Sequence, residues 1–326
     1  MSTDPDRSIE TLIRLAGERE MPSDEATARA RAAAEGSWRS MLHQPRPRRL
    51  RVPLAIAATL ALALAVPGWY ALNQREATQA PVVVARVVTV DGIARMASGR
   101  ALGLARPDSE VMSGDTLQTG EGRAAATIGD ALSLRLDHDT RLRFQGPDRV
   151  TLLQGSLYVD SGGLGLGPPL TISTPAGDVR HIGTQFQVRV VAGTTAIRVR
   201  EGRVALRRGE AIAHTVAAGD ALEVRGSEER WQHGLPSFGA EWEWSATLAP
   251  ALTIEDRPMA EFLAWMAREH GWQLHFSDES LQRRAQEIHL HGSVEGLDAP
   301  GMLTRVALVT GVPLTLDAGV LWVGAR

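Results

Sequence analysis

Hydroxyl, imidazole and carboxylate side chains lie close together in the segment STPAGDVRHIGTQFQVRV, which spans residues 173–190. Hydrolases with a hydroxyl nucleophile place a His beside it to take its proton, and a carboxylate beside the His to orient it. In this segment His181 could serve Thr184 or Thr174, and Asp178 could orient His181. The sequence shows no recognisable oxyanion hole or nucleophile elbow to complete such a site. The catalytic interpretation therefore rests on residue types alone.

The same segment fits a corner in a β-rich fold. Phe186 and Val188 alternate with polar residues, as in a half-buried strand. Gly177 and Gly183 would adopt backbone angles that other residues avoid, and the hydroxyl groups would bond nearby backbone groups. We therefore interpret the segment as structural and expect no catalytic residue. The chain is not expected to be an enzyme.

The composition argues against several kinds of site. The chain has no cysteine, which rules out disulfides, zinc ribbons and a thiol nucleophile. His289 and His291 would share one face of a strand, but two ligands without a third do not define a zinc site. The net charge of −3 creates no general attraction to nucleic acid. We expect no metal ion, no cofactor and no nucleic-acid partner.

Residues 52–74 form an uncharged, mostly apolar run that is long enough to cross a lipid bilayer as one helix. Trp69 and Tyr70 are placed as an interfacial aromatic pair at its far end. Four basic residues precede the run: Arg46, Arg48, Arg49 and Arg51. Because basic flanks stay in the cytoplasm, the sequence predicts a single membrane span. The N-terminus would be cytoplasmic, and residues 75–326 would lie outside the cytoplasm.

Two alternatives for this run remain open at this point. A cleaved signal peptide has a short region before its apolar core, whereas about fifty residues precede this one. A helix buried in a protein core would carry polar residues at helical spacing, and this run has almost none. An uncleaved membrane anchor is the interpretation that fits best.

Residues 1–51 are polar and rich in alanine, and they predict one or two small helices with Ser23 or Asp24 as a helix cap. Such a segment has too little apolar surface for a core of its own, so it would fold against a partner. Trp38 is the aromatic residue that could contact that partner. We interpret residues 1–51 as a short helical head on the cytoplasmic side.

Residues 82–226 consist of short alternating runs separated by Gly, Asp and Pro, which is typical of β-structure. Residues 150–159 resemble residues 197–206, and both stretches have a central glycine. Recurring strand–Gly–strand units favour stacked rungs, as in a solenoid. Because the spacing of the units is irregular, a β-sandwich stays open as the alternative. A mainly β domain is the predicted fold class.

A connector, residues 227–248, leads to a small α+β domain in residues 249–326. Trp242 and Trp244 in the connector could pack between the domains or meet a partner. In the last domain, residues 259–270 predict a helix, a second helix begins near Pro300, and a hairpin closes the chain over residues 317–319. We expect this hairpin, residues 312–323, to offer an open strand edge to a partner. Leu321 and Trp322 would lie on that edge.

The order of these parts, together with one motif set, resembles the FecR family of inner-membrane signal regulators. The motif residues are Thr174, Pro175, Gly177, Ile182, Gly183, Thr184, Phe186 and Val188, joined by the LLQGSLYV, VREGRVAL and AAGDALEV segments. The similarity to the core of the family runs from about Asp115 to Val224. The C-terminal domain resembles the short domain at the N-termini of secretins and TonB-dependent transducers.

This resemblance implies a signal relay. Its periplasmic part would contact the signalling domain of a TonB-dependent outer-membrane receptor, as in the regulation of iron uptake. Its cytoplasmic head would restrain or activate an extracytoplasmic-function (ECF) sigma factor, as in regulators of the anti-sigma-factor type. Two other classes remain open: a periplasmic scaffold of an envelope machine, and a membrane-anchored periplasmic enzyme.

Overall fold

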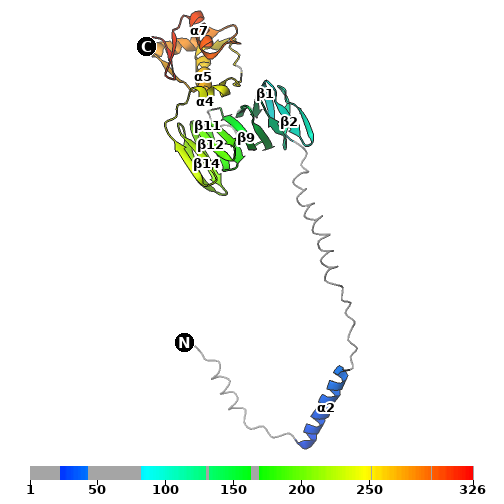
Figure 1. Cartoon of the computed structure of the whole chain (residues 1–326). Coiled ribbons are helices and arrows are strands. Elements are labelled where there is room, and N and C mark those ends of the chain that lie inside the picture. Colours follow the sequence, from blue (N-terminus) through cyan, green and yellow to red (C-terminus); the bar gives the residue numbers. More distant parts are fainter. Residues whose placement is uncertain are drawn as a thin grey trace, which may run out of the picture. The chain divides into compact units, whose positions relative to one another are not determined.

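Strands outnumber helices in the part of the chain that the computed structural model describes, which comprises residues 23–42, 82–129, 132–162, 169–250, 252–294 and 296–325 (Figure 1). The chain divides into two units, Met1–Thr78 and Gln79–Arg326. The mainly β prediction is therefore confirmed for the second unit. This unit contains two hydrophobic cores, one in a β domain and one in a C-terminal α+β domain.

The described part of the first unit contains one helix, α2 (Asp24–Leu42). The backbone N–H of Ala26 donates to the Ser23 carbonyl at 2.9 Å and meets the Ser23 hydroxyl at 3.4 Å, so Ser23 lies at the predicted cap. Trp38 lies on this helix, with its side chain outside the described part. Residues 52–74 also lie outside the described residues. Among the helices that are described, none combines the length and apolarity needed to cross a bilayer.

The β domain carries fifteen strands. In chain order they are β1 (Val83–Asp91), β2 (Arg95–Ser98), β3 (Ala101–Leu104), β4 (Glu110–Met112), β5 (Thr116–Gln118), β6 (Arg123–Ile128), β7 (Leu132–Leu136), β8 (Arg141–Gly146), β9 (Arg149–Asp160), β10 (Thr171–Thr174), β11 (Gly177–Val191), β12 (Thr194–Arg208), β13 (Ala211–Ala217), β14 (Ala221–Arg225) and β15 (Glu228–Gln232). All fifteen are hydrogen-bonded into one sheet. The sheet reaches into the predicted connector, because β15 ends at Gln232.

Three long strands, β9, β11 and β12, make this single sheet fold over into two layers. The first half of β9 pairs with β8 and β10, whereas its second half pairs with β7 and β11. One layer runs β4, β1, β6, β7, second half of β9, second half of β11, first half of β12, β14, β15. The other runs β3, β2, β5, β8, first half of β9, β10, first half of β11, second half of β12, β13.

Glycines mark the points where the long strands pass from one layer to the other. Gly155, Gly183 and Gly202 lie near the middle of β9, β11 and β12, and all have positive φ angles, of 92°, 58° and 79°. A Cβ atom on Gly155 would lie 2.4 Å from the Thr140 Cα, and one on Gly202 would lie 2.4 Å from the Gly183 carbonyl oxygen. These corners therefore require glycine for both backbone angle and space.

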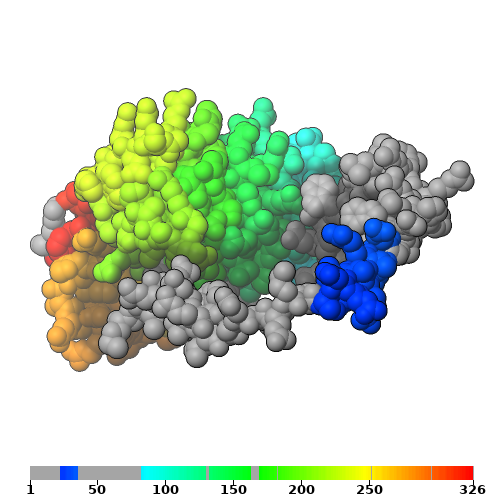
Figure 2. Space-filling view, turned by 90° about the horizontal axis from the view of Figure 1, so that it is seen from below, coloured from blue at the N-terminus to red at the C-terminus, as the bar shows by residue number. Residues whose placement is uncertain are grey.

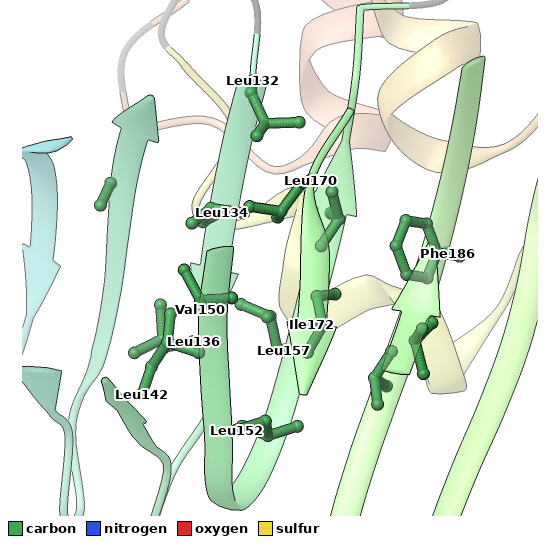
Figure 3. Packing of buried hydrophobic residues seen from close by; sticks show 14 of the residues in the cluster. Leu132, Leu134, Leu136, Leu142, Val150, Leu152, Leu157, Leu170, Ile172 and Phe186 are labelled. Atoms are coloured by element: carbon green, nitrogen blue, oxygen red, sulfur yellow. The ribbon is translucent and has the colours of Figure 1, made fainter. Parts of the chain in front are cut away.

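The two layers enclose the main hydrophobic core. Figure 3 shows Leu134 and Leu157 of one layer close to Val150 and Ile172 of the other, and all four side chains are fully buried. Apolar residues alternate with polar ones along the strands, so each layer turns one face inward and one outward. Residues 150–159 and 197–206, the two predicted repeats, are the central parts of β9 and β12. Because neighbouring strands of this sheet pair antiparallel except β9 and β10, the fold is the second alternative, a two-layer sandwich, and its layers share continuous strands.

The C-terminal domain surrounds its own core with helices and two small sheets. Its elements are α4 (Ala240–Ala246), β16 (Arg257–Pro258), α5 (Met259–His270), β17 (Gln273–Phe276), α6 (Glu279–Glu287), β18 (His289–Leu290), α7 (Ala299–Thr310), β19 (Leu314–Asp317) and β20 (Val320–Val323). The α5 helix has the predicted bounds, and its inward residues Phe262 and Met266 are fully buried. The closing hairpin was predicted correctly, with Ala318 and Gly319 at positive φ in its turn.

Two features of this domain differ from the sequence-based expectation. Helix α6 was not predicted, because its residues are mostly polar and only Ala285 is buried. Val309 follows the buried Val306 at helical spacing on α7, yet it is 69% exposed, and the neighbouring Leu308 is 82% exposed. The α7 helix buries Leu303 and Val306 instead. Its last turn therefore presents apolar side chains to solvent.

Candidate functional site

The segment 173–190 forms the β10–β11 hairpin and the first corner of β11. The Ser173 hydroxyl donates to Asp178 at 2.8 Å, and the Thr174 hydroxyl donates to the Gly177 carbonyl at 2.7 Å. Burial alone would raise the pKa of Asp178, but hydrogen bonds from Ser173 and Arg149 outweigh it and lower the pKa below its usual value. The hydroxyl groups thus bond within the turn, as expected from the structural interpretation.

His181 is not arranged for catalysis with these groups. Its Nε2 accepts a hydrogen bond from the Leu170 backbone N–H at 3.1 Å, and its ring stacks on Phe186 with centroids 5.8 Å apart. Burial lowers the pKa of His181. The carboxylate of Asp178 is bonded to Ser173 and Arg149 instead of His181. No hydrogen bond joins His181 to Thr184 or Thr174 among the described residues, so the structure does not bring the hypothetical triad together.

The remaining motif residues serve the same corner. Gly177 has φ of 135°, and a Cβ atom there would lie 2.2 Å from the Arg207 carbonyl oxygen. Phe186 and Val188 are fully buried in the main core, and Pro175 is exposed in the turn. Thr184 is buried, and its N–H donates to Ser161 Oγ at 2.7 Å. Ile182 lies in β11, with its side chain outside the described part.

Two buried arginines of the β domain, Arg135 and Arg200, contact the C-terminal domain. Arg135, in the middle of β7, is completely buried, and its Nη1 lies 2.7 Å from Oε2 of Glu269 near the end of α5. The same Nη1 donates to the Ser245 carbonyl at 2.8 Å. Figure 2 shows the orange C-terminal domain against the yellow-green part of the β domain. We call this contact the junction, and it covers the outer face of the layer that contains β7.

Arg200 of β12 is the second cation of the junction. Its Nη1 donates to the Glu269 carbonyl at 3.1 Å and to the Tyr158 hydroxyl at 3.3 Å. Its guanidinium lies 4.6 Å from the centre of the Trp242 ring, a cation–π contact. Burial lowers the pKa of Arg200 and raises that of Tyr158. Both side chains are therefore held by the C-terminal domain and by each other.

The two connector tryptophans pack at this junction. Trp242 is buried, donates from Nε1 to the Pro236 carbonyl at 3.1 Å, and meets the Tyr158 ring edge-on with centroids 6.2 Å apart. Trp244 meets the same Tyr158 ring at 6.5 Å. Of the two roles that the sequence left open for these residues, their contacts match packing between domains.

Charged groups around the rim of the junction add further links. Arg268 of α5 pairs with Asp160 of β9 and, at 3.1 Å, with Glu201 of β12. Arg198 of β12 pairs with Glu241 of α4. Sequence reasoning missed Arg135, Arg200 and Glu269, since isolated charges in strands and helices read as solvent-exposed. A buried ion pair such as Arg135–Glu269 is by itself weak evidence of net stabilisation, because both charges lose their water.

The predicted open edge on the last strand was wrong. The three-stranded sheet has the order β17–β20–β19, so β20 is the central strand, with β17 parallel on one side and β19 antiparallel on the other. Leu321 is fully buried, so a Leu321→Pro change would disrupt the domain core instead of removing an edge donor. Trp322 contacts the His275 ring at 4.4 Å. Among the described residues, β19 borders the sheet and pairs with β20 alone.

The two histidines that could share a strand face, His289 and His291, contact different groups. His289 Nδ1 lies 3.1 Å from the Glu287 carbonyl, and His291 Nδ1 lies 3.1 Å from Glu255. Within the described ranges, no three His, Asp or Glu side chains are grouped closely enough to hold a metal ion.

The model of the FecR protein family matches residues 115–205. The matched region is therefore similar to the FecR family. It contains the three corner glycines, the segment 173–190 and both buried arginines of the junction, Arg135 and Arg200. Glu269, which pairs with Arg135, lies outside the FecR region. The matched residues begin at Asp115, where the sequence resemblance also placed the start of the family core.

Two crystal structures of a candidate anti-sigma factor from Parabacteroides distasonis ATCC 8503, at 2.50 and 1.65 Å resolution, are similar to the chain. The first is 16% identical, with 64% of this chain and 97% of that chain covered and a TM-score of 0.33. The second is 15% identical, with 65% and 99% covered and a TM-score of 0.34. A comparison with curated proteins found no match.

Proposed function

We propose that the chain is a single-pass signal relay of the inner membrane. Its periplasmic unit senses the state of a TonB-dependent outer-membrane receptor, and its cytoplasmic head controls an ECF sigma factor. The observation that carries this proposal is the FecR match over residues 115–205. The uncharged run at residues 52–74 with its arginine flank supports the topology. Regulation by contact, without catalysis, agrees with the hydrogen bonding of the segment 173–190.

The junction supports a relay because it makes the two periplasmic domains respond together. The Arg135–Glu269 pair and the Arg200–Trp242 contact hold the C-terminal domain to the FecR region. When a partner binds the C-terminal domain and shifts α5, the shift is therefore transmitted to the β domain through these contacts. Loss of either domain alone would stop the transmission of the signal.

The receptor contact is proposed at the border strand β19. Its Leu316 is 39% exposed, and the apolar residues Leu308 and Val309 at the end of α7 are exposed as well. An extended segment of the receptor could add to β19 through main-chain hydrogen bonds. A Leu316→Lys change should block this addition, because edge lysines oppose strand pairing. Reporter-gene induction at equal protein level measures the effect, with Thr304→Lys on exposed α7 as the matched control.

The sigma-factor contact is proposed in residues 1–51, with Trp38 as an aromatic anchor. Full-length protein, solubilised in detergent, should capture an ECF sigma factor, and Trp38→Ala should weaken the capture while Arg29→Ala, at an exposed position of α2, should not. Capture of no ECF sigma factor by the full-length protein would contradict the relay and favour a periplasmic scaffold. Reporter fusions after residue 100 that are active in the cytoplasm would contradict the topology.

A further inference from the structure

The outer face of the second sheet layer carries many arginines and almost no carboxylates. The strands of this layer are β3, β2, β5, β8, the first half of β9, β10, the first half of β11, the second half of β12, and β13. We call their outward side the open face. Asp178 is the acidic residue of these strands, and it pairs with Arg149 at 3.1 Å.

Five outward arginines of this face form no ion pair with a carboxylate among the described residues: Arg95, Arg141, Arg143, Arg180 and Arg203. The charge of Arg180 nevertheless acts on the nearby Asp178. The outward direction of these arginines follows from the register. Arg141 and Arg143 alternate with the buried Leu142, and Arg95 is two strands away from Arg141 through Gln118 of β5. The strand spacing places the Cα atoms of Arg95 and Arg141 about 10 Å apart, and those of Arg141 and Arg143 about 7 Å apart, on the same face.

Apolar side chains project from the same face. Leu102 and Leu104 of the border strand β3 are 61% and 58% exposed, and the register places Leu104 opposite Arg95. Leu153 of β9 is 47% exposed and alternates with the buried Leu152. Each leucine thus stands on the arginine side of the sheet. Single exposed leucines are common on protein surfaces. Leucines that lie beside arginines without ion pairs are instead complementary to a layered surface, with anionic groups on the outside and an apolar layer beneath them.

We propose that the open face docks on a membrane surface that contains anionic phospholipids. Guanidinium groups bind phosphate oxygens in a planar, two-pronged geometry, and each basic residue near an anionic bilayer contributes about 1 kcal/mol. Leu102 and Leu104 insert at the level of the headgroups. The inference rests on the proposed topology in one respect. If the span ends at Gln74, the chain to Val82 reaches at most about 28 Å, which keeps this domain near the bilayer.

The absence of cysteine from the chain allows a direct test with the full-length protein. Leu102→Cys and, separately, Leu308→Cys are labelled with an environment-sensitive fluorophore and reconstituted in vesicles of phosphatidylcholine, with or without phosphatidylglycerol. The label at position 102 should shift to the blue and be quenched by nitroxide-bearing lipid in the anionic vesicles, and high salt should reverse both effects. The label at position 308 on α7 should respond to neither lipid.

Charge-reversed variants test whether the arginines cause the docking. Arg141→Glu with Arg143→Glu should abolish the response at position 102. Arg283→Glu with Arg305→Glu, an equal change of charge on exposed helix residues, should leave it intact. A silent label at position 102, or an equal response in both kinds of vesicle, would overturn the proposal. Survival of the response in the Arg141→Glu, Arg143→Glu protein would also overturn it.

Two further measurements distinguish lipid docking from the proposed signal relay, and from the binding of an acidic protein to the open face. Added to preformed vesicles from outside, the detergent-solubilised chain should float with anionic vesicles even if residues 52–74 do not insert, and failure to float would count against docking. If docking is absent and Arg141→Glu with Arg143→Glu still alters reporter induction, the open face belongs to an acidic protein partner and the lipid proposal is wrong. Docking without any capture of a sigma factor would leave this proposal standing and remove the relay.

Discussion

The two outer faces of the folded sheet begin from the same local pattern and differ in what covers them. Arg135 lies in the stretch LSLRL and Arg143 in the stretch RLRF, both with leucine or phenylalanine on alternate positions that face the core. Arg135 is completely buried under the C-terminal domain, whereas Arg143 is exposed. An arginine on the outward side of a strand therefore does not by itself determine whether the side chain is buried under another domain or exposed to solvent.

What decides the difference is the partner that each arginine meets. On the covered face, Glu269 lies against Arg135, and its carbonyl accepts from Arg200. On the open face, Arg141 and Arg143 have no such partner among the described residues. A buried cation needs a compensating anion and hydrogen bonds, whereas an exposed one is solvated by water. Substitutions on the covered face should therefore change the unfolding free energy much more than substitutions on the open face.

The largest effect is expected at the corners that connect the two faces. A Gly155→Ala change forces a Cβ atom to within 2.3 Å of the Thr140 hydroxyl and keeps a non-glycine residue at φ of 92°. Strain and overpacking together should cost about 3 kcal/mol or more of unfolding free energy. Chemical denaturation followed by circular dichroism measures this loss. Because β9 runs through both layers, both faces should unfold together.

The matched control for this change is Gly103→Ala on β3, where a Cβ atom would meet nothing within 4 Å. We expect that variant to unfold like the parent protein. If Gly155→Ala is equally stable, the corner does not need glycine, and the description of two layers sharing rigid strands would have to be abandoned.

The next largest effect should separate the two domains without unfolding the sheet. Glu269→Gln removes the charge that compensates Arg135 while it keeps the shape of the side chain. Leaving a buried charge unpaired costs about 3–5 kcal/mol. Limited proteolysis should then cut the chain between β15 and α4, and the near-ultraviolet signal of Trp242 should change. Glu261→Gln on the exposed side of the same helix, paired with Arg257, is the matched control and should have little effect.

Local patterns in the sequence predicted much of this fold, because they report on neighbours within a few residues. The bounds of α5, the hairpin over residues 317–319 and the structural nature of segment 173–190 all follow from periodicity and glycine chemistry. The position of β20 did not follow, because its second neighbour, β17, lies far away in sequence and pairs with it in parallel.

The junction could not be predicted for a related reason. Alternation shows that Arg135 and Arg143 both face away from the core, but only the tertiary structure shows which outward face meets another domain. Glu269 near the end of α5 looks like an ordinary surface residue, with a His and an Arg beside it. The signal that could have pointed to the junction is the pair Trp242 and Trp244, whose large apolar rings need a covering surface.

A smaller effect, dependent on pH, should appear at the covered face and not at the open one. Burial, and then the nearby Arg200 and Arg135, lower the pKa of His270 to about 4. Between this value and the ordinary pKa of about 6.5, the unfolded chain binds a proton that the folded chain does not. The unfolding free energy should therefore fall as the pH drops from 6.5 toward 4, by at most about 1.4 kcal/mol per unit.

Denaturation curves at several pH values check this slope, which solvent screening reduces because the ring is partly exposed. His270→Gln should flatten the curve, although the buried His181 retains a contribution of the same sign. An unchanged slope in His270→Gln would show that this ring is not desolvated by the junction.

The smallest effect on stability is expected on the open face. Arg141→Ser and Arg143→Ser remove exposed cations that have no ion pair within the described part of the chain, so each should change the unfolding free energy by less than about 0.5 kcal/mol. Removing like charges that lie two residues apart on one strand could even stabilise the fold slightly. The measurement is the denaturation midpoint at low and high salt, compared with that of Glu269→Gln. A loss comparable to that of Glu269→Gln would mean that the open face is held by contacts within the chain, and the contrast between the two faces would disappear. A small change would instead show that folding does not depend on these arginines.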